Sequence, residues 1–236
     1  MLQDLFKGGS MEMSVEPLEL PADVHPLWGD CMVNRISVIV FIILFILEFS
    51  DLFRLYKPLF RCLVVWKGNL DIEHSVSLAR TRNTVSLVMA MGLCLICDRW
   101  GLTAPSFKTA LPAEWQLAVS TAMIAGYMLL RRLLYVVSKF RSPTNEYAAT
   151  LRHSVNNYQI LLTSLMLVSC LLFKAPGFDD MVIRIVLIIE AMAFTLLHLV
   201  RVSQIFASRC SLLATFLYLC ALEILPLGVL AFVCTL

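Results

Sequence analysis

Long apolar runs separated by short polar segments dominate the chain. A membrane-spanning helix needs about 20 mostly apolar residues, because each residue advances it by about 1.5 Å through about 30 Å of hydrocarbon. The runs are too long and too uniformly apolar for barrel strands. Six runs meet the requirement, at about residues 33–53, 84–102, 115–136, 156–174, 181–203 and 211–235. The pattern predicts an all-α, polytopic membrane protein with a six-transmembrane-helix bundle over residues 33–236, preceded by an acidic segment over residues 1–32.

The segment after the first span has a different pattern. Arg54, Lys57 and Arg61 fall on one helical face, and the opposite face carries Leu55, Leu59, Phe60, Leu63 and Trp66. This pattern predicts an amphipathic helix over residues 52–67 that lies on the membrane surface and bends at Pro58. One interpretation is a docking surface for anionic lipid or a partner. The favoured interpretation is an anchor that only fixes where the chain leaves the membrane after the first span.

The composition supports a membrane location. Hydrophobic residues make up 59% of the 236 residues, charged residues 15%, and the mean hydropathy is +0.81. Soluble domains carry about 25% charged residues. The net charge of +2 excludes nucleic-acid binding by bulk charge.

The eight cysteines are scattered, mostly in apolar runs, where a thiol packs as a small apolar group. Residues 1–30 are acidic and show no cleavable signal peptide, so the first span is expected to direct insertion.

The distribution of basic residues predicts the orientation. Cytoplasmic loops of membrane proteins are enriched in lysine and arginine. With the N-terminus outside, thirteen of the 19 basic residues lie on the cytoplasmic side: Arg54, Lys57, Arg61, Lys67, Arg80, Arg82, Arg131, Arg132, Lys139, Arg141, Arg152, Arg201 and Arg209. Both termini are therefore expected outside the cytoplasm.

Two glutamates fall inside predicted spans. A short connection near Ala207 makes the last two spans antiparallel neighbours, and Glu190 and Glu223 lie at nearly equal distances from it. An ionisable group within a span is a functional hypothesis, because it is costly to insert. If the two carboxylates face each other, one is neutral or a cation or Arg184 sits nearby. The pair would then bind and transfer protons or cations, with Pro226 opening the backbone. In the slightly favoured alternative, each glutamate separately holds helices together, either protonated or bonded to a neighbouring hydroxyl.

A second polar layer is expected near the cytoplasmic boundary. Its members are Glu48, Asp51, Arg131, Arg132, Asn156, Asn157, His198 and Arg201. Glu48 and Asp51 share a helix face, as do His198 and Arg201, so an acidic and a basic face could meet across the bundle. An inward-facing cavity for a charged ligand is one interpretation, and a structural clamp is the favoured one.

Candidates for redox and metal chemistry are few. Cys94 and Cys97 form a CxxC pair near the outer end of the second span, which is similar to the pair in membrane thiol oxidases; packing is the favoured interpretation. Of the four histidines, only His198 lies well inside a span, so we expect no haem, no metal and no other cofactor. Motifs of hydrolytic and nucleotide-driven enzymes are absent from the sequence.

The C-terminal stretch LYLCALEILPLGVL, with Glu223 and Pro226, resembles the end of a family of uncharacterised polytopic inner-membrane proteins of Bacteroidota. Tyr158 and Gln159, at the start of the fourth predicted span, also resemble that family. The resemblance covers about residues 36–236 and implies an inner-membrane protein whose outer side faces the periplasm. It also implies an association with tetrapyrrole synthesis through neighbouring genes. The family is defined by sequence alone, so the resemblance carries over no reaction.

Three functions follow from these observations. The first is a non-enzymatic inner-membrane subunit that assembles with other envelope proteins, motivated by the small size and missing catalytic motifs. A membrane or periplasmic protein, or a second copy of the chain, is expected as a partner. The second is a small proton- or ion-coupled transporter that uses Glu190 and Glu223. The third is a thiol oxidoreductase that uses Cys94 and Cys97.

Overall fold

The computed structural model describes residues 28–65, 68–103, 105, 108, 111–137, 145–208 and 211–235. These residues form helices and no strands. The helices are the short 3₁₀ helix η2 (Trp28–Asp30), α1 (Met32–Val64), α2 (Gly68–His74), α3 (Val76–Arg99), α5 (Ala113–Val137), α6 (Asn145–Lys174), α7 (Asp180–Ala207), α8 (Leu212–Leu219), the π-helical turn η3 (Cys220–Ile224) and α9 (Leu225–Thr235).

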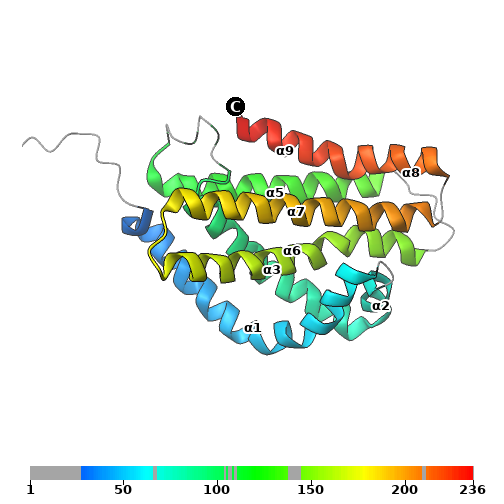
Figure 1. The fold of residues 1–236 in the computed structure, drawn as a ribbon, viewed down its shortest axis with the longest axis horizontal. Coiled ribbons are helices and arrows are strands. Elements are labelled where there is room, and N and C mark those ends of the chain that lie inside the picture. The colour runs from blue at the N-terminus through cyan, green and yellow to red at the C-terminus, as the bar shows by residue number, and fades with distance from the viewer. Residues whose placement is uncertain are drawn as a thin grey trace, which may run out of the picture.

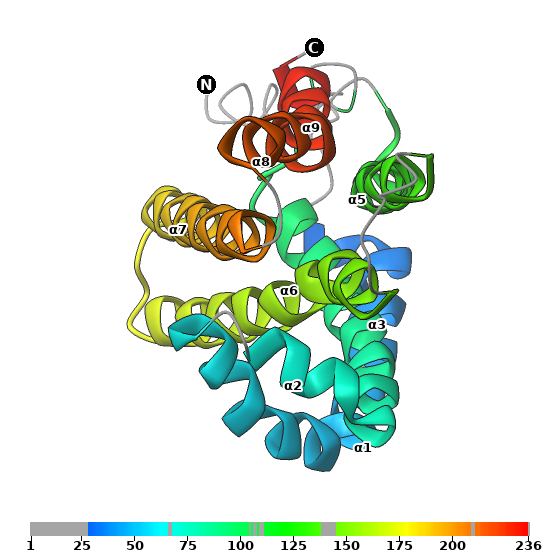
Figure 2. The same cartoon turned by 90° about the vertical axis from the view of Figure 1, so that its right-hand side faces the viewer.

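The long helices run back and forth along one direction (Figure 1). α1, α5 and α7 run from the end that carries η2 to the end that carries α2, while α3, α6 and the run from α8 to α9 return. We call these the η2 end and the α2 end. Viewed end on, α6 lies in the centre, α3, α1 and α2 lie on one side of it, and α5, α7, α8 and α9 lie on the other (Figure 2).

Five described helical segments are long and apolar enough to cross a membrane. They are Met32–Val64, Ala113–Val137, Thr150–Lys174, Asp180–Ala207 and Leu213–Cys234. An all-helical, multi-pass membrane protein is therefore confirmed. The predicted count of six spans is not, because α3 does not meet the same test. Its inward face is unusually polar, with Arg82, Ser86 and Asp98 all buried.

The predicted surface helix over residues 52–67 is the last part of α1, which continues through Pro58 to Val64. Leu52, Leu55 and Leu59 are buried and pack on Ile72 of α2 and on α3 and α6. The apolar stripe was correctly located, but its buried part faces the protein, so a separate helix on the membrane surface is not confirmed. Trp66 and Lys67, like the acidic segment up to residue 27, lie outside the described residues.

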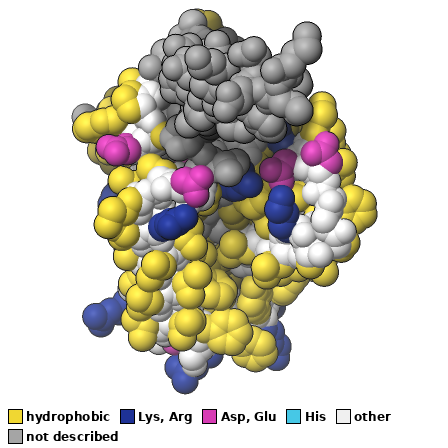
Figure 3. Space-filling model, turned by 90° about the vertical axis from the view of Figure 1, so that its left-hand side faces the viewer, with side chains coloured by type: hydrophobic (Ala, Val, Ile, Leu, Met, Phe, Trp, Pro, Cys, Tyr) yellow, Lys and Arg dark blue, Asp and Glu magenta, His cyan; other side chains and the backbone are white. Residues whose placement is uncertain are grey.

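The core lies where α3 and α6 pack together. Ile160 on α6 is fully buried with Met89 on α3 at the α2 end. Towards the η2 end, Ile96 on α3 and Met166 on α6 pack on Ile183 of α7. The outer faces of α1 and α7 are apolar and exposed, as expected of helices that contact lipid. At the η2 end, acidic and basic side chains lie next to each other among apolar ones (Figure 3), including the ion pairs of Asp180 with Arg99 and Lys174.

The connection between α1 and α2 requires a residue without a side chain. A Cβ atom at Gly68 would lie 2.9 Å from the backbone nitrogen of Cys62 and 3.0 Å from the carbonyl carbon of Arg61. Backbone atoms cannot rotate away as a side chain can. The glycine therefore allows α2 to fold back closely on the end of α1.

We predict that Gly68→Ala lowers the free energy of unfolding by about 1–3 kcal/mol, the usual cost of overpacking. Unfolding by denaturing detergent in mixed micelles measures it. Gly126→Ala on α5 is the matched control, because a Cβ there meets nothing within 4 Å. It should leave stability unchanged or slightly raised. Equal stabilities of the two variants would contradict the close approach.

Candidate functional site

The most buried charged group in the described structure is Glu223, whose side chain is 0% exposed. Arg131 of α5 donates to both of its oxygens, from Nη2 to Oε1 at 2.6 Å and from Nε to Oε2 at 2.9 Å. The Tyr135 hydroxyl donates to Oε1 at 2.6 Å. His198 Nε2 of α7 lies 3.4 Å from Oε2. Three separate segments of the chain therefore meet at one carboxylate, which we call the Glu223 centre.

The sequence around Glu223 explains how a glutamate points into the bundle. Pro226 has no N–H, so it cannot donate to the carbonyl of Leu222, four residues earlier. The helix widens into the π-helical turn η3, in which the N–H of Leu225 donates to the carbonyl of Cys220. Such turns are often found at functional sites. Leu222 and Glu223 are the buried residues of this turn.

Arg131 also ties the centre to α6. Its Nη1 donates to the carbonyl of Arg152 at 3.1 Å and its Nη2 to the carbonyl of Leu151 at 3.2 Å. A buried ion pair is stable only when its remaining donors and acceptors are also bonded. The Arg131 side chain satisfies this condition, since each of its three nitrogens has an acceptor. The pair therefore acts as a clamp between α5, α6 and the π-helical turn.

A small cavity of about 120 Å³ lies next to the centre, where Tyr158, Gln159 and His198 are among its lining residues. The Tyr158 ring packs against the His198 ring with centroids 4.9 Å apart, and its hydroxyl donates to the carbonyl of Cys62 at 3.2 Å. His198 Nδ1 and Gln159 Nε2 are buried and have no partner in the described part of the chain. The cavity thus borders two polar atoms that are available to bond.

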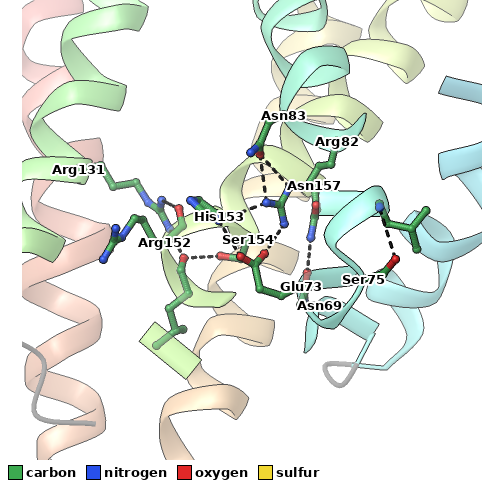
Figure 4. A network of polar contacts seen from close by, with 12 residues as sticks. Asn69, Glu73, Ser75, Arg82, Asn83, Arg131, Arg152, His153, Ser154 and Asn157 are labelled. Atoms are coloured by element: carbon green, nitrogen blue, oxygen red, sulfur yellow. Dashed lines mark hydrogen bonds and ion pairs between the residues drawn. The ribbon is translucent and has the colours of Figure 1, made fainter. Parts of the chain in front are cut away.

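A second cluster joins α2, α3 and α6 at the α2 end (Figure 4). The Arg82 side chain is 1% exposed and donates to Glu73 at 2.7 Å and to Asn83 at 3.1 and 3.2 Å. His153 Nδ1 lies 3.1 Å from Glu73 and 3.2 Å from Arg82. The bond with His153 and the ion pair with Arg82 hold the pKa of Glu73 at about 2, below its ordinary value of 4.5. α2 is therefore held in place by charge as well as by apolar packing.

A third cluster lies at the η2 end around Asp98, which is almost fully buried. Lys108 Nζ lies 2.7 Å from Asp98, and the Ser120 hydroxyl and the Trp28 indole donate to the carboxylate at 2.9 and 2.7 Å. Lys108 also donates to Ser120 and to the carbonyl of Thr103. The carboxylate and the ammonium are bonded on several sides, so this cluster joins η2, α3 and α5 structurally.

Glu190 and Glu223, predicted to lie at similar depth, are not brought together. Glu190 accepts a hydrogen bond from the hydroxyl of Ser169 on α6. Glu223 lies beside His198, which follows Glu190 on α7 by eight residues, or about 12 Å. Counting from Ala207 misplaced the two depths because α7 ends at Ala207 whereas α8 begins at Leu212, so Glu190 lies 17 residues from its helix end and Glu223 only 11 from the start of α8. Arg184 is exposed on α7 and is not part of the centre.

The predicted contact between an acidic face on α1 and a basic face on α7 is also absent from the described contacts. Asp51 pairs with Arg54 of its own helix at 3.7 Å, and both are exposed. Arg201 donates to the carbonyl of Leu63 at 2.6 and 3.0 Å and so joins the end of α1 to α7. Glu48 is half-buried, with Oε2 unpartnered within the described residues. Arg201 bonds to a backbone oxygen of α1, and Arg131 bonds to Glu223, because these are the acceptors that face them.

The other predicted residues occupy different places. Asn157 donates to Asn69 of α2 at 2.8 Å. Asn156 and Gln159 line a cavity between α3, α5 and α6. Cys94 and Cys97 are buried free thiols on α3. Within the described residues, no three His, Cys, Asp or Glu side chains are grouped to hold a metal ion.

The sequence analysis identified several of the buried charged residues but not the residues that they contact. Arg131 and Glu223 were both singled out, but they were assigned to different polar layers. The sequence analysis assigned no partner to Glu73, His153 or Lys108, because a single sequence carries no signal of contacts between distant segments. The π-helical turn had one visible signal, the proline three residues after Glu223.

Comparisons with protein-family models, with curated proteins and with solved structures find no match to this chain. The fold and the Glu223 centre therefore have to be interpreted from their own geometry.

We predict that Arg131→Met or Glu223→Leu alone lowers the free energy of unfolding by about 3–5 kcal/mol, because each leaves one buried charge without its partner. The double variant should recover most of that loss, since no unpaired charge remains. Detergent-induced unfolding measures all three. Arg132→Met, at an exposed neighbouring position, is the control and should change stability by less than about 0.5 kcal/mol. Additive effects in the double variant would contradict the clamp.

We predict a pH-dependent contribution from Glu73. A carboxylate whose pKa is lowered on folding stabilises the fold at pH values above its ordinary pKa, and this stabilisation is lost as pH falls towards the folded value. The stability difference between the wild type and Glu73→Gln should therefore be full above about pH 4.5 and shrink towards pH 2. Unfolding measured in detergent across this range tests it. Asp71→Asn is the control, because its pair with Arg61 is exposed. A difference that does not change with pH would refute the role of Glu73.

Proposed function

We propose that this chain is a non-enzymatic integral membrane protein of the bacterial inner membrane that serves as an accessory or assembly subunit of an envelope complex. One observation carries the proposal. The buried charged side chains Glu223, Arg131, Arg82, Asp98 and Lys108 are bonded to other groups of the same chain. Charges used in this way hold helices in fixed positions. A scaffold for other subunits needs such rigidity.

The geometry of Glu223 favours a structural role over proton transfer. A carrier carboxylate must exchange its proton during each cycle, whereas this carboxylate accepts two hydrogen bonds from a guanidinium and one from Tyr135. Bonds to the charged form favour ionisation. Protonation of the Glu223 carboxylate would also leave Arg131 buried without its counter-charge. Both effects oppose a change of protonation at this position.

The membrane arrangement of the subunit is part of the proposal. We infer that α3 is a sixth span, since it runs antiparallel to α1 and α5 and its 24 residues are enough to cross the hydrocarbon layer. Its buried polar residues face α2, α5 and α6 rather than lipid. The α2 end is the cytoplasmic one, because Arg54, Arg61 and Arg80 are exposed there. Both termini then lie in the periplasm. Membership of the Bacteroidota family stays a prediction.

A proton- or ion-coupled transporter is the second candidate. It is favoured by one specific observation, the cavity beside His198, whose Nδ1 is buried and unpartnered within the described chain. Histidine changes charge within the physiological pH range. In this alternative, His198 rather than Glu190 works together with Glu223.

We predict that the chain co-elutes with at least one envelope protein in a fixed ratio when a tagged copy is purified in gentle detergent from its native membrane. Mass spectrometry of the intact complex measures the ratio. The exposed faces of α1 and α7 offer the surface, so Ile46→Trp on α1 should weaken the complex without loss of the subunit. Leu133→Trp, the same kind of change at an exposed position of α5 outside these faces, is its control. Elution of the chain alone or as a homo-oligomer would refute the assembly role and favour the transporter.

A further inference from the structure

A cavity of about 390 Å³, lined by both polar and apolar side chains, opens at the α2 end between α3, α5 and α6. Its lining contains three arginines and a histidine together with polar side chains: Arg131, Arg132, Arg152, His153, Asn83, Ser86, Asn156 and Gln159. No aspartate or glutamate of the described residues lines it. Glu223 already balances Arg131. Within the described residues Arg132 and Arg152 form no ion pair, so these two provide the positive charge of the cavity.

The unpartnered atoms at this cavity are both hydrogen-bond donors. Gln159 is 6% exposed, and its Nε2 has no acceptor in the described part of the chain. Arg152 Nε is buried and equally without an acceptor there. A buried donor left unpaired is destabilising, because it has lost its hydrogen bonds to water and gained none in return. Two donors and uncompensated positive charge in one cavity indicate a missing acceptor that is negatively charged.

A second cavity continues from the first. It has a volume of about 560 Å³ and runs between α3 and α5, with an apolar lining that includes Leu95, Leu117 and Ile124. Ala90, Met128 and Arg132 line both cavities, so the two are contiguous. From Arg132 to Leu117 the groove follows 15 residues of α5, or about 22 Å. One leaflet of hydrocarbon is about 15 Å thick. The groove is therefore long enough for an acyl chain.

The depth of the two cavities matches a lipid. Arg152 lies near the start of the candidate span Thr150–Lys174, and Arg132 lies near the end of the span Ala113–Val137. The basic cavity is thus at the level of lipid headgroups, while the apolar groove lies within the hydrocarbon. Figure 4 shows that Arg131 and Arg152 come from separate helices, and Arg131 bonds to the backbone of Arg152. The clamp at Glu223 therefore also fixes one wall of the basic cavity.

We propose that these joined cavities bind one anionic phospholipid, with its phosphate against Arg132, Arg152 and Gln159 and an acyl chain in the groove between α3 and α5. Charge complementarity selects an anionic headgroup, and the groove selects a lipid over a free anion. This site is separate from the surface that the assembly proposal uses. A failed lipid test would therefore leave the subunit role untouched.

Native mass spectrometry of the purified chain, titrated with phosphatidylglycerol or with zwitterionic phosphatidylcholine, tests the proposal. We expect one phosphatidylglycerol per chain, bound more tightly than phosphatidylcholine. Arg152→Gln should weaken it about fivefold, the factor expected for one basic residue at an anionic headgroup. Ala125→Phe should weaken it by filling the groove, since Ala125 lines it and is exposed. The two variants change different helices, so one misfolded variant does not remove the test.

Two matched controls are available. Arg80→Gln removes an exposed charge at the same end, and Ala122→Phe adds the same ring at an exposed position of α5 that does not line the groove. Both should bind as the wild type does. Equal binding of the two lipids, or phosphatidylglycerol binding that neither Arg152→Gln nor Ala125→Phe reduces, would overturn the proposal. Displacement of the lipid by millimolar inorganic phosphate would also overturn it, because the site would then hold a free anion.

Discussion

The cost of a charge in a low-dielectric interior is the constraint on which this structure depends. Glu223 is fully buried, and the cost of burying its charge is offset by hydrogen bonds that Arg131 and Tyr135 donate to it directly. Arg131 in turn requires the carbonyl oxygens of Leu151 and Arg152. Satisfying one carboxylate thus fixes α5, α6, α7 and the π-helical turn relative to one another. Removing either charge is expected to loosen all four.

The same principle recurs at both ends of the bundle. Asp98 with Lys108 fixes η2, α3 and α5 at one end, and Arg82 with Glu73 fixes α2, α3 and α6 at the other. Helices in lipid gain no hydrophobic driving force from packing on one another, so polar contacts and close packing hold them together. Three internally bonded clusters in a small chain favour a rigid scaffold. Arg131 connects the Glu223 centre to the basic cavity, because it bonds to Glu223 and also lines that cavity.

Several elements could be predicted from the pattern of residues alone. Apolar runs of sufficient length predicted the helices, and the structure has a helix at each predicted position, because the backbone of a span in lipid must bond to itself. The stripe of Leu55 and Leu59 correctly marked a buried face of α1. The prediction that the membrane surface covers this face is not confirmed, since an apolar face packs equally well on lipid and on another helix. Here α2 covers it, a seven-residue helix with no apolar run of its own.

The sequence by itself determined that this is an all-helical membrane protein, and it singled out Glu223, Arg131 and His198, because a charged or polar group within a span is rare and costly. Only the tertiary structure decided their partners. Arg131 and Glu223 are separated by 92 residues, and a widened turn before Pro226 aims the carboxylate. The basic cavity depended on tertiary structure in the same way, because three separate helices supply its walls. Contacts between distant segments depend on the packing of whole helices, which local sequence patterns do not encode.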